Sequence, residues 1–284
     1  MSPINNYTPT DKHSQKVKII IGIATILLSL TACTNVKSPT QLNTNEKPLK
    51  VAIPEHKFPG KSQLSTKIEN LNFTVPSKYQ GKTVYQVEPS DKEKVIALTI
   101  DDGPWPKTTL EMLDICKQNN VKVTFFWVGN ALQANPEIAK RVVAEGHAIG
   151  NHTWHHWYRN MDAATAKSEI ERTNDLIYKT TGVKTSFFRP PGGYLNNGLA
   201  AYAKNKQNSV VLWSVTSADT DPRAKPQAFV KNVLKGAKPG AIVLMHDGGG
   251  NRERTVKALP EIISGLKQQG YRFVTVPELL KMQP

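Results

Sequence analysis

The feature of the sequence that most constrains its fold is an alternation, beginning at Val95, of short β-rich runs with longer helical patterns. Alternation of this kind is typical of a parallel sheet covered by helices. We therefore expect an α/β fold, a distorted (β/α) barrel of about seven parallel strands with a short N-terminal β extension. The expected strands are residues 95–100, 123–128, 148–150, 185–189, 210–214, 241–245 and 272–274, and the expected helices lie near residues 106–119, 136–145, 162–181, 196–206, 226–236 and 255–269.

The N-terminal region has the pattern of an export signal followed by a tether. A lysine-containing segment precedes the apolar run IIIGIATILLSL at residues 19–30, which is too short to cross a bilayer comfortably. The run ends in LTAC, which resembles the bacterial lipobox, in which the cysteine, here Cys33, is lipidated and the chain is cut before it. We expect a signal peptide with lipobox at 1–33, a flexible linker at 34–70 and an extension packing on the barrel at 71–94. Plain secretion and an uncleaved anchor stay open.

Cys116 is the one cysteine left once Cys33 is assigned to lipidation. It falls within an expected helix, where we expect a small buried hydrophobe without a catalytic role. A disulfide between the two cysteines stays open if Cys33 carries no lipid.

The formal charge of +14 permits a polyanionic partner, such as nucleic acid, an anionic membrane surface or an acidic polymer. The basic residues are spread along the chain, with no long Lys/Arg run and no basic stripe interleaved with aromatic residues. We therefore expect no nucleic-acid partner.

Polar and charged residues gather at the C-terminal ends of the expected strands. In a β/α barrel those ends share one face with the loops that follow them, and such folds build their active sites there. Packing alone gives a chain no reason to place carboxylates, imidazoles and a guanidinium on one rim. These residues are Asp101 and Asp102 after the first strand, His152 and His156 after the third, Arg189 at the end of the fourth, Asp219 beyond the fifth and His246 after the sixth.

The segment HTWHH places His152 and His156 at i and i+4, a spacing at which two imidazoles on a helical turn face the same way and reach one metal ion. Asp102 would complete a set of two histidines and one carboxylate, with positions left open for water and substrate. A cation on Asp102 would also offset one of two adjacent negative charges and leave Asp101 available as a base. A HxxxH segment alone is more often an incidental His-rich turn, but the other motifs at matching strand ends argue against that interpretation.

Four motifs, in order and each after its own strand, resemble those of the polysaccharide deacetylases of carbohydrate esterase family 4, the NodB-homology domain. The resemblance covers roughly residues 94–280 and implies a deacetylase catalytic domain at 95–284. The first motif usually has Phe where Ile100 stands. The matching segments are TIDDGP at 99–104, HTWHH at 152–156, RPPGG at 189–193 and LMH at 244–246.

The resemblance also implies a role for each matching residue. Asp102, His152 and His156 would bind a divalent metal, with zinc the first choice and cobalt, nickel or iron as alternatives. Asp101 would be the general base that takes a proton from the attacking water, and His246 the general acid that protonates the leaving amine. Arg189 would orient Asp101, the backbone N–H at Gly192 would help to stabilise the oxyanion, and Asp219 would tune His246.

Residues that flank the motifs are candidates for contact with a sugar chain. The aromatic ones could stack on sugar rings, although large aromatic residues are also routine in protein cores. His155, between the two expected ligands, is interpreted as a hydrogen-bonding neighbour. Thr220 stands where the family usually has a Trp that forms a wall of the acetyl pocket, so the resemblance does not determine the shape of this pocket or its substrate preference. The expected substrate-binding residues are Trp105, Trp154, Pro191, Gly193, Tyr194 and Leu244.

Together these observations predict an exported, metal-dependent amidohydrolase that removes acetyl groups from N-acetylglucosamine-type residues of a cell-envelope polysaccharide. Peptidoglycan is the first choice of substrate, because a tethered enzyme can reach it, and poly-N-acetylglucosamine or chitin comes next. An O-acetyl xylan esterase and a noncatalytic glycan-binding lipoprotein are the alternatives, with a membrane-surface nucleic-acid binder a weaker third. We expect a monomer, held on a membrane through Cys33 and facing the periplasm or cell wall, or secreted if the lipobox is not used.

Overall fold

The computed structural model describes residues 73–90 and 93–283. The expected signal peptide, the lipidation site Cys33 and the linker at 34–70 lie outside the described residues. Of the expected extension at 71–94, the described part contacts the sheet at several points. Val87 N donates to Gly240 O over 3.0 Å, and Phe73 is buried in the core and forms a parallel bridge with Thr185.

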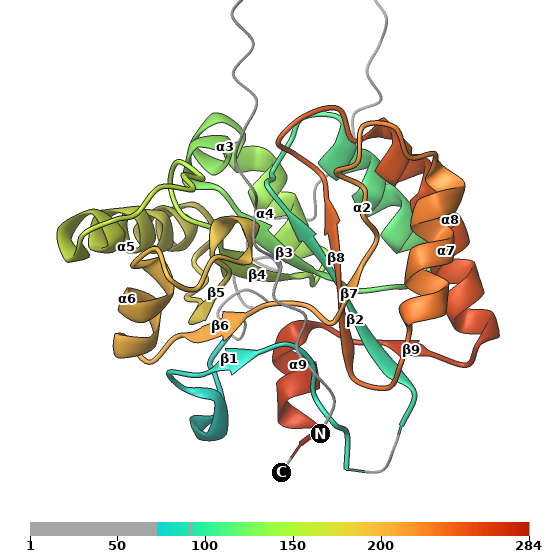
Figure 1. Cartoon of the computed structure of the whole chain (residues 1–284). Coiled ribbons are helices and arrows are strands. Elements are labelled where there is room, and N and C mark those ends of the chain that lie inside the picture. The colour runs from blue at the N-terminus through green and yellow to red at the C-terminus, as the bar shows by residue number, and fades with distance from the viewer. Residues whose placement is uncertain (1–72, 91–92, 284) are drawn as a thin grey trace, which may run out of the picture. The chain divides into compact units, whose positions relative to one another are not determined.

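The described residues form one sheet of nine strands that curls into a distorted barrel, which confirms the expected fold class (Figure 1). The hydrogen-bonded order is β1-β6-β5-β4-β3-β2-β8-β7, with β9 also on β2, and every strand pair is parallel. The strands are β1 (Thr83–Val84), β2 (Val95–Asp101), β3 (Thr124–Trp127), β4 (Ala148–Asn151), β5 (Phe187–Phe188), β6 (Ser209–Val211), β7 (Val215–Thr216), β8 (Ala241–His246) and β9 (Arg272–Phe273).

Strand β2 lies in the interior of the sheet, where it pairs with β3, β8 and β9, and all seven of its residues are buried. A strand covered on both faces reads as a continuous apolar run, as VIALTI does. Helices pack around the sheet (Figure 1). They are α2 (Thr108–Gln118), α3 (Gly129–Ala134), α4 (Pro136–Ala144), α5 (Ala163–Thr181), α6 (Leu199–Asn205), α7 (Pro226–Gly236), α8 (Glu253–Gln268) and α9 (Val276–Lys281), with 3₁₀ turns at Ser77–Tyr79 and Pro191–Gly193.

The expected fifth strand at 210–214 covers the end of β6 and the connection that leads to β7, and the two strands lie far apart in the hydrogen-bonded order, β6 next to β1 and β7 next to β8. Leu212 N donates to Val84 O over 2.7 Å on the β6 side, whereas Ser214 N donates to Ile242 O over 3.1 Å on the β8 side. The backbone therefore changes partners within three residues, and this short connection, residues 212–214, joins the two ends of the sheet. The expectation of one continuous strand was wrong because the sequence pattern does not reveal a change of partner.

Cys116 lies in α2 and is fully buried, as expected. Burial raises the pKa of its thiol to about 12, so the thiol stays protonated and unreactive at neutral pH. Among the described helices, none has both the length and the apolar character that a bilayer crossing requires.

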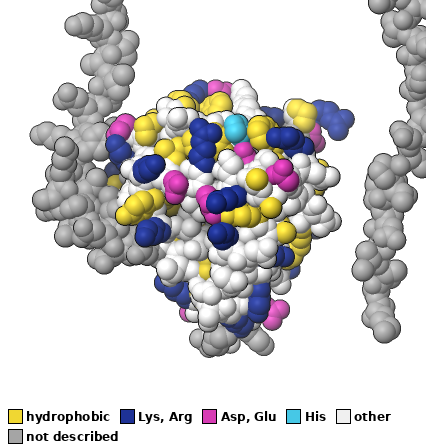
Figure 2. Space-filling model, turned by 90° about the vertical axis from the view of Figure 1, so that its left-hand side faces the viewer, with side chains coloured by type: hydrophobic (Ala, Val, Ile, Leu, Met, Phe, Trp, Pro, Cys, Tyr) yellow, Lys and Arg dark blue, Asp and Glu magenta, His cyan; other side chains and the backbone are white. Residues whose placement is uncertain are grey.

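Basic side chains are dispersed over the face shown in Figure 2, where they alternate with acidic, hydrophobic and neutral side chains. Among the described residues, several basic side chains pair with carboxylates, for example Lys140 with Glu137 and Arg141 with Asp114. Dispersed charge of this kind attracts polyanions weakly and is screened by salt.

Candidate active site

Five strand ends bring the polar residues together. Asp101 is the last residue of β2 and His246 the last residue of β8, and the register of these neighbouring strands pairs the two directly. His152 follows β4, Arg189 follows β5 and Asp219 follows β7. A pocket of about 1120 Å³ opens over these strand ends, and its lining includes Asp101, Asp102, His152, His156 and His246.

Asp102, His152 and His156 form a cluster of possible metal ligands. Asp102 Oδ1 lies 3.5 Å from His152 Nε2 and 3.2 Å from His156 Nε2, and one ligand atom from each residue lies within 4.8 Å of the others. The same Asp102 oxygen is buried and has no hydrogen-bond partner. An unpartnered buried carboxylate oxygen beside two imidazole nitrogens is a donor set that a divalent cation fits.

The protonation of His152 suits a ligand. Its Nδ1 lies 2.6 Å from Arg189 O, so Nδ1 carries the hydrogen and Nε2 keeps its lone pair toward Asp102. Burial, with help from His156, lowers the pKa of His152 to about 3, so the imidazole is neutral at neutral pH. The lone pair of His152 Nε2 and the carboxylate oxygen of Asp102, 3.5 Å apart, both suit a cation placed between them.

The segment at 152–156 is a loop, so the expectation that its histidines sit on a helical turn was wrong. Thr153 and His156 have positive φ angles of 70° and 60°, and Thr153 Oγ1 accepts from His156 N over 3.0 Å. Glu169 of α5 accepts from the N–H groups of Trp154 and His155, and its other oxygen lies 2.5 Å from His155 Nδ1. These bonds hold the loop so that both ligand imidazoles face Asp102, and His155 is a hydrogen-bonding neighbour, as expected.

Asp101 is held by Arg189, which is fully buried. Arg189 Nη1 donates to Asp101 Oδ1 over 2.7 Å and to Thr99 Oγ1 over 2.8 Å, while its other nitrogens donate to carbonyl oxygens at the β6 end. Burial raises the pKa of Asp101 above its usual value, and the guanidinium of Arg189 opposes that rise. The second carboxylate oxygen, Oδ2, lies 3.7 Å from His152 Nε2 and so remains on the side of the ligand cluster.

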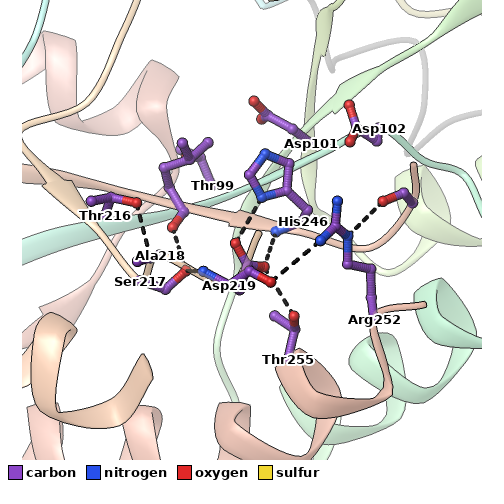
Figure 3. A network of polar contacts seen from close by, with 12 residues as sticks. Thr99, Asp101, Asp102, Thr216, Ser217, Ala218, Asp219, His246, Arg252 and Thr255 are labelled. Atoms are coloured by element: carbon purple, nitrogen blue, oxygen red, sulfur yellow. Dashed lines mark hydrogen bonds and ion pairs between the residues drawn. The ribbon is translucent and has the colours of Figure 1, made fainter. Parts of the chain in front are cut away.

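His246 is held by Asp219, as Figure 3 shows. Asp219 Oδ1 accepts from His246 Nδ1 over 2.8 Å, and Oδ2 accepts from His246 N and from Thr255 Oγ1, each over 2.9 Å. Nε2 is therefore left for the pocket, on the side where Asp101 lies. Burial alone lowers the pKa of His246, but the hydrogen bond and charge of Asp219 outweigh it and raise the pKa above its ordinary value.

The expected substrate-binding residues divide into two groups. Trp105, which is 41% exposed, and Leu244 line the pocket, as do Gly192 and the unusual Thr220. The other four are not among the described residues that line the pocket. Pro191 is buried, and Gly193 lies against Trp213. Tyr194 is exposed and meets Tyr158 edge-on, whereas Trp154 is only 4% exposed and lies beneath the guanidinium of Arg172. The idea of Trp154 as a platform for a sugar ring is therefore wrong, because neighbouring residues cover its indole.

Other lining residues were missed from the sequence. Trp213 lies in the connection between β6 and β7, Thr216 ends β7, Tyr158 follows the ligand loop, and Arg252 precedes α8. The run GGGNR at 248–252, one residue after LMH, was a signal for Arg252, since a Gly-rich loop after a strand end leaves room for the next long side chain.

The fold and the site define the class of protein. The family model of the polysaccharide deacetylases matches residues 88–211. A peptidoglycan-N-acetylglucosamine deacetylase of Bacillus cereus is 44% identical over 203 residues, which are 68% of this chain and 92% of that protein. The chain therefore belongs to the polysaccharide deacetylase family, the NodB-homology domain of carbohydrate esterase family 4.

Solved structures extend the likeness. A crystal structure of a peptidoglycan N-acetylglucosamine deacetylase in complex with 4-naphthalen-1-yl-N-oxidanyl-benzamide is 33% identical, covers 72% of this chain and 94% of that chain, and has a TM-score of 0.67. A family pseudoenzyme from Bacillus anthracis is 30% identical, with coverage of 71% and 69% and a TM-score of 0.64. Because the fold is shared by a deacetylase and a pseudoenzyme, the argument for activity has to come from the site residues.

Proposed function

We propose that this protein is a metal-dependent deacetylase that hydrolyses the acetamide of N-acetylglucosamine-type residues in peptidoglycan. The observation that carries the proposal is the ligand cluster of Asp102, His152 and His156 beside the register pair Asp101 and His246. Relatives that are named peptidoglycan N-acetylglucosamine deacetylases support the choice of substrate.

Hydrolysis of an acetamide needs a water made nucleophilic, stabilisation of the oxyanion that forms, and a proton for the departing nitrogen. A divalent cation on Asp102, His152 and His156, most simply zinc, would supply Lewis acidity toward water and the acetamide carbonyl. In the proposed reaction Asp101 takes a proton from water as the new C–O bond forms. His246 gives a proton to the nitrogen as the C–N bond breaks, and the products are acetate and a free amino sugar.

The two proton-transfer groups are held in the forms that this reaction needs. Arg189 fixes Asp101 by a hydrogen bond and by charge, and its guanidinium opposes the rise in the pKa of Asp101 that burial causes, which favours the ionised carboxylate. Asp219 fixes the tautomer of His246 and raises its pKa, so the imidazolium persists to higher pH. We assign Gly192, which lines the pocket, to the oxyanion through its backbone N–H.

A noncatalytic glycan-binding protein is the alternative from another class. It has to be considered because one of the similar structures is a pseudoenzyme of the same family. The complete set of ligand, base and acid residues argues for turnover here. A protein that only bound glycan would have no use for the buried Asp101–Arg189 pair, which is costly to desolvate.

The test is acetate release from a panel containing peptidoglycan glycan strands, N-acetylglucosamine oligomers and O-acetyl xylan, with and without a chelator. We expect release from the first two, loss of release with chelator and recovery with zinc. Asp101→Asn should abolish release, whereas Asp175→Asn, an exposed carboxylate on α5, should not. Glycan binding by the wild-type protein without any acetate release would establish the noncatalytic alternative, and release from xylan alone would establish the esterase.

We also propose that the chain is exported and anchored through a lipid on Cys33. Support comes from the sequence, in which a lysine-containing segment, a short apolar run and LTAC follow one another. Incorporation of radiolabelled fatty acid into the wild-type protein, and its loss in Cys33→Ser, would support the anchor. An unlabelled protein in the culture medium would instead indicate plain secretion.

A further inference from the structure

Arg252 is a cationic side chain in the pocket that the proposed reaction does not use. It directly precedes α8, lines the pocket and is partly buried. Its Nε donates to Gly248 O over 2.7 Å, and its Nη1 donates to Asp219 O over 3.3 Å. The guanidinium is thus fixed by two backbone carbonyl oxygens, neither of which neutralises its charge.

No carboxylate within residues 73–90 and 93–283 forms an ion pair with Arg252, although Arg141, Arg189, Arg223 and Arg272 each have one. Two of the nearby acidic groups are already engaged, and Asp102 belongs to the ligand cluster. Both carboxylate oxygens of Asp219 accept hydrogen bonds from His246, and Asp101 pairs with Arg189. A fixed, partly buried guanidinium without a counter-charge is an arrangement that suits an incoming anion.

The orientation of Arg252 points to the pocket. In Figure 3 two of its nitrogens make the marked contacts, and the third is turned to the side of the network on which Asp102 lies, beside His246. A nitrogen in this position is available to an anionic group that enters the pocket beside His246.

We propose that Arg252 binds a carboxylate of the substrate and selects acetylated glycans that carry one at or next to the reacting sugar, as an N-acetylmuramic acid residue with a free lactyl group does. This inference rests on the proposed deacetylase function. It assigns to the pocket a preference for anionic glycan over neutral chitin-like chains. Arg252 is a specificity-determining residue in this scheme and takes no part in the proton transfers.

The test compares two matched substrates with the metal-loaded enzyme: peptide-free peptidoglycan strands with free lactyl carboxylates, and the same strands with those carboxylates converted to methyl amides. We expect the wild type to prefer the acidic form by about tenfold in kcat/KM, the effect of one charge-assisted contact. Arg252→Gln should remove the preference and Arg252→Lys should keep part of it. Arg254→Gln is the matched control, because Arg254 lies in the first turn of α8, contacts the carbonyls of Pro222 and Ala224 and is not part of the described lining.

Two outcomes would overturn the inference: equal rates on both substrates with the wild type, or an equal loss on both in Arg252→Gln, which would mean that Arg252 only supports Asp219. Acetate, the product of the reaction, also carries a carboxylate, so adding it tests whether Arg252 binds product in place of substrate. If acetate inhibits the wild type but not Arg252→Gln, and no substrate preference exists, the residue binds product. Calorimetric binding of both strands to Asp101→Asn measures the preference without turnover, so failure of the deacetylase proposal and failure of this inference are distinguishable.

Discussion

Arg189 Nη1 donates to Asp101 Oδ1 over 2.7 Å, and the two side chains are 0% and 3% exposed. The pair links β5 to β2 through the interior of the barrel, so the proposed base is fixed from a strand three positions away in the sheet order. A buried pair of this kind contributes to geometry more surely than to net stability, because both charges have been removed from water.

Replacing Arg189 with Met should therefore reduce both the stability of the protein and its activity at low pH. The change leaves Asp101 buried without its partner, which we expect to reduce the free energy of unfolding by about 3–5 kcal/mol. The pKa of Asp101 should rise further, and because the base must be ionised, the acidic limb of the kcat profile should move to higher pH. Urea unfolding and a pH–rate profile measure both effects. Arg223→Met, at an exposed pair with Asp221, should change stability by no more than about 1 kcal/mol; similar losses in the two variants would contradict this account.

Replacing Asp219 with Asn should lower the pKa of His246, the proposed general acid. His246 has a raised pKa through Asp219, and a general acid is active only while protonated, so activity should fall as pH rises through that pKa. Without the carboxylate the pKa falls, and the basic limb of the kcat profile should move to lower pH, with kcat at neutral pH lower by about 100-fold. Thr255→Val, which removes one hydrogen bond to Asp219, should shift the limb less. An unmoved basic limb in Asp219→Asn would exclude His246 as the acid.

Loading with zinc should stabilise the fold through the ligand cluster. Binding to the folded state alone adds about 2.7 kcal/mol at a free metal concentration of 100 times Kd, so the melting temperature should rise with zinc and fall with chelator. Asp102→Asn should lose most of this response because it removes the unpartnered oxygen at the centre of the cluster. Asp175→Asn should respond like the wild type. A melting temperature indifferent to zinc in the wild type would exclude the metal site.

Asp247 should make the chelated protein less stable at alkaline pH. Its Oδ2 accepts from Thr109 Oγ1 over 2.5 Å, its Oδ1 is buried without a partner, and burial raises its pKa from 3.8 to about 7. Because the folded pKa is the higher one, the contribution of Asp247 to stability is most favourable below about pH 4 and declines until about pH 7, by on the order of 4 kcal/mol in all. Asp247→Asn should therefore gain stability over the wild type at pH 8 but not at pH 4.

Urea unfolding of the chelated proteins at pH 4 and pH 8 measures the effect of Asp247. Asp175→Asn, at an exposed position, should show no such difference between the two pH values. A gain of the same size at both pH values would mean that the amide relieves a packing defect and that Asp247 does not titrate in this range.

The sequence alone was sufficient to predict which site residues lie at the C-terminal ends of the parallel strands. Asp101 and His246 end β2 and β8, and parallel pairing of two apolar runs brings them side by side whatever the helices do. The same reasoning located Arg189 and Asp219, since each follows its own strand. The regular alternation of strands and helices also determined the fold class.

Other features depend on contacts between segments far apart along the chain, which no local pattern contains. The loop at 152–156 is shaped by Glu169, and a HxxxH spacing alone suggested a helical turn. Trp154 is covered by Arg172 from α5. The helices α3 and α9 are only six residues each, too short for a periodic apolar pattern to stand out.

The change of partner at 212–214 gives this barrel an uneven capacity to vary. The backbone there is held by hydrogen bonds on both sides, and Leu212 O also accepts from Arg189, so the main chain of the joint has to stay in place. The side chains of Trp213, Thr216 and Thr220 shape the pocket without taking part in the proposed chemistry. Exchanges of these side chains offer a route to new sugar preferences, in evolution or in the laboratory, that leaves the hydrolytic residues undisturbed.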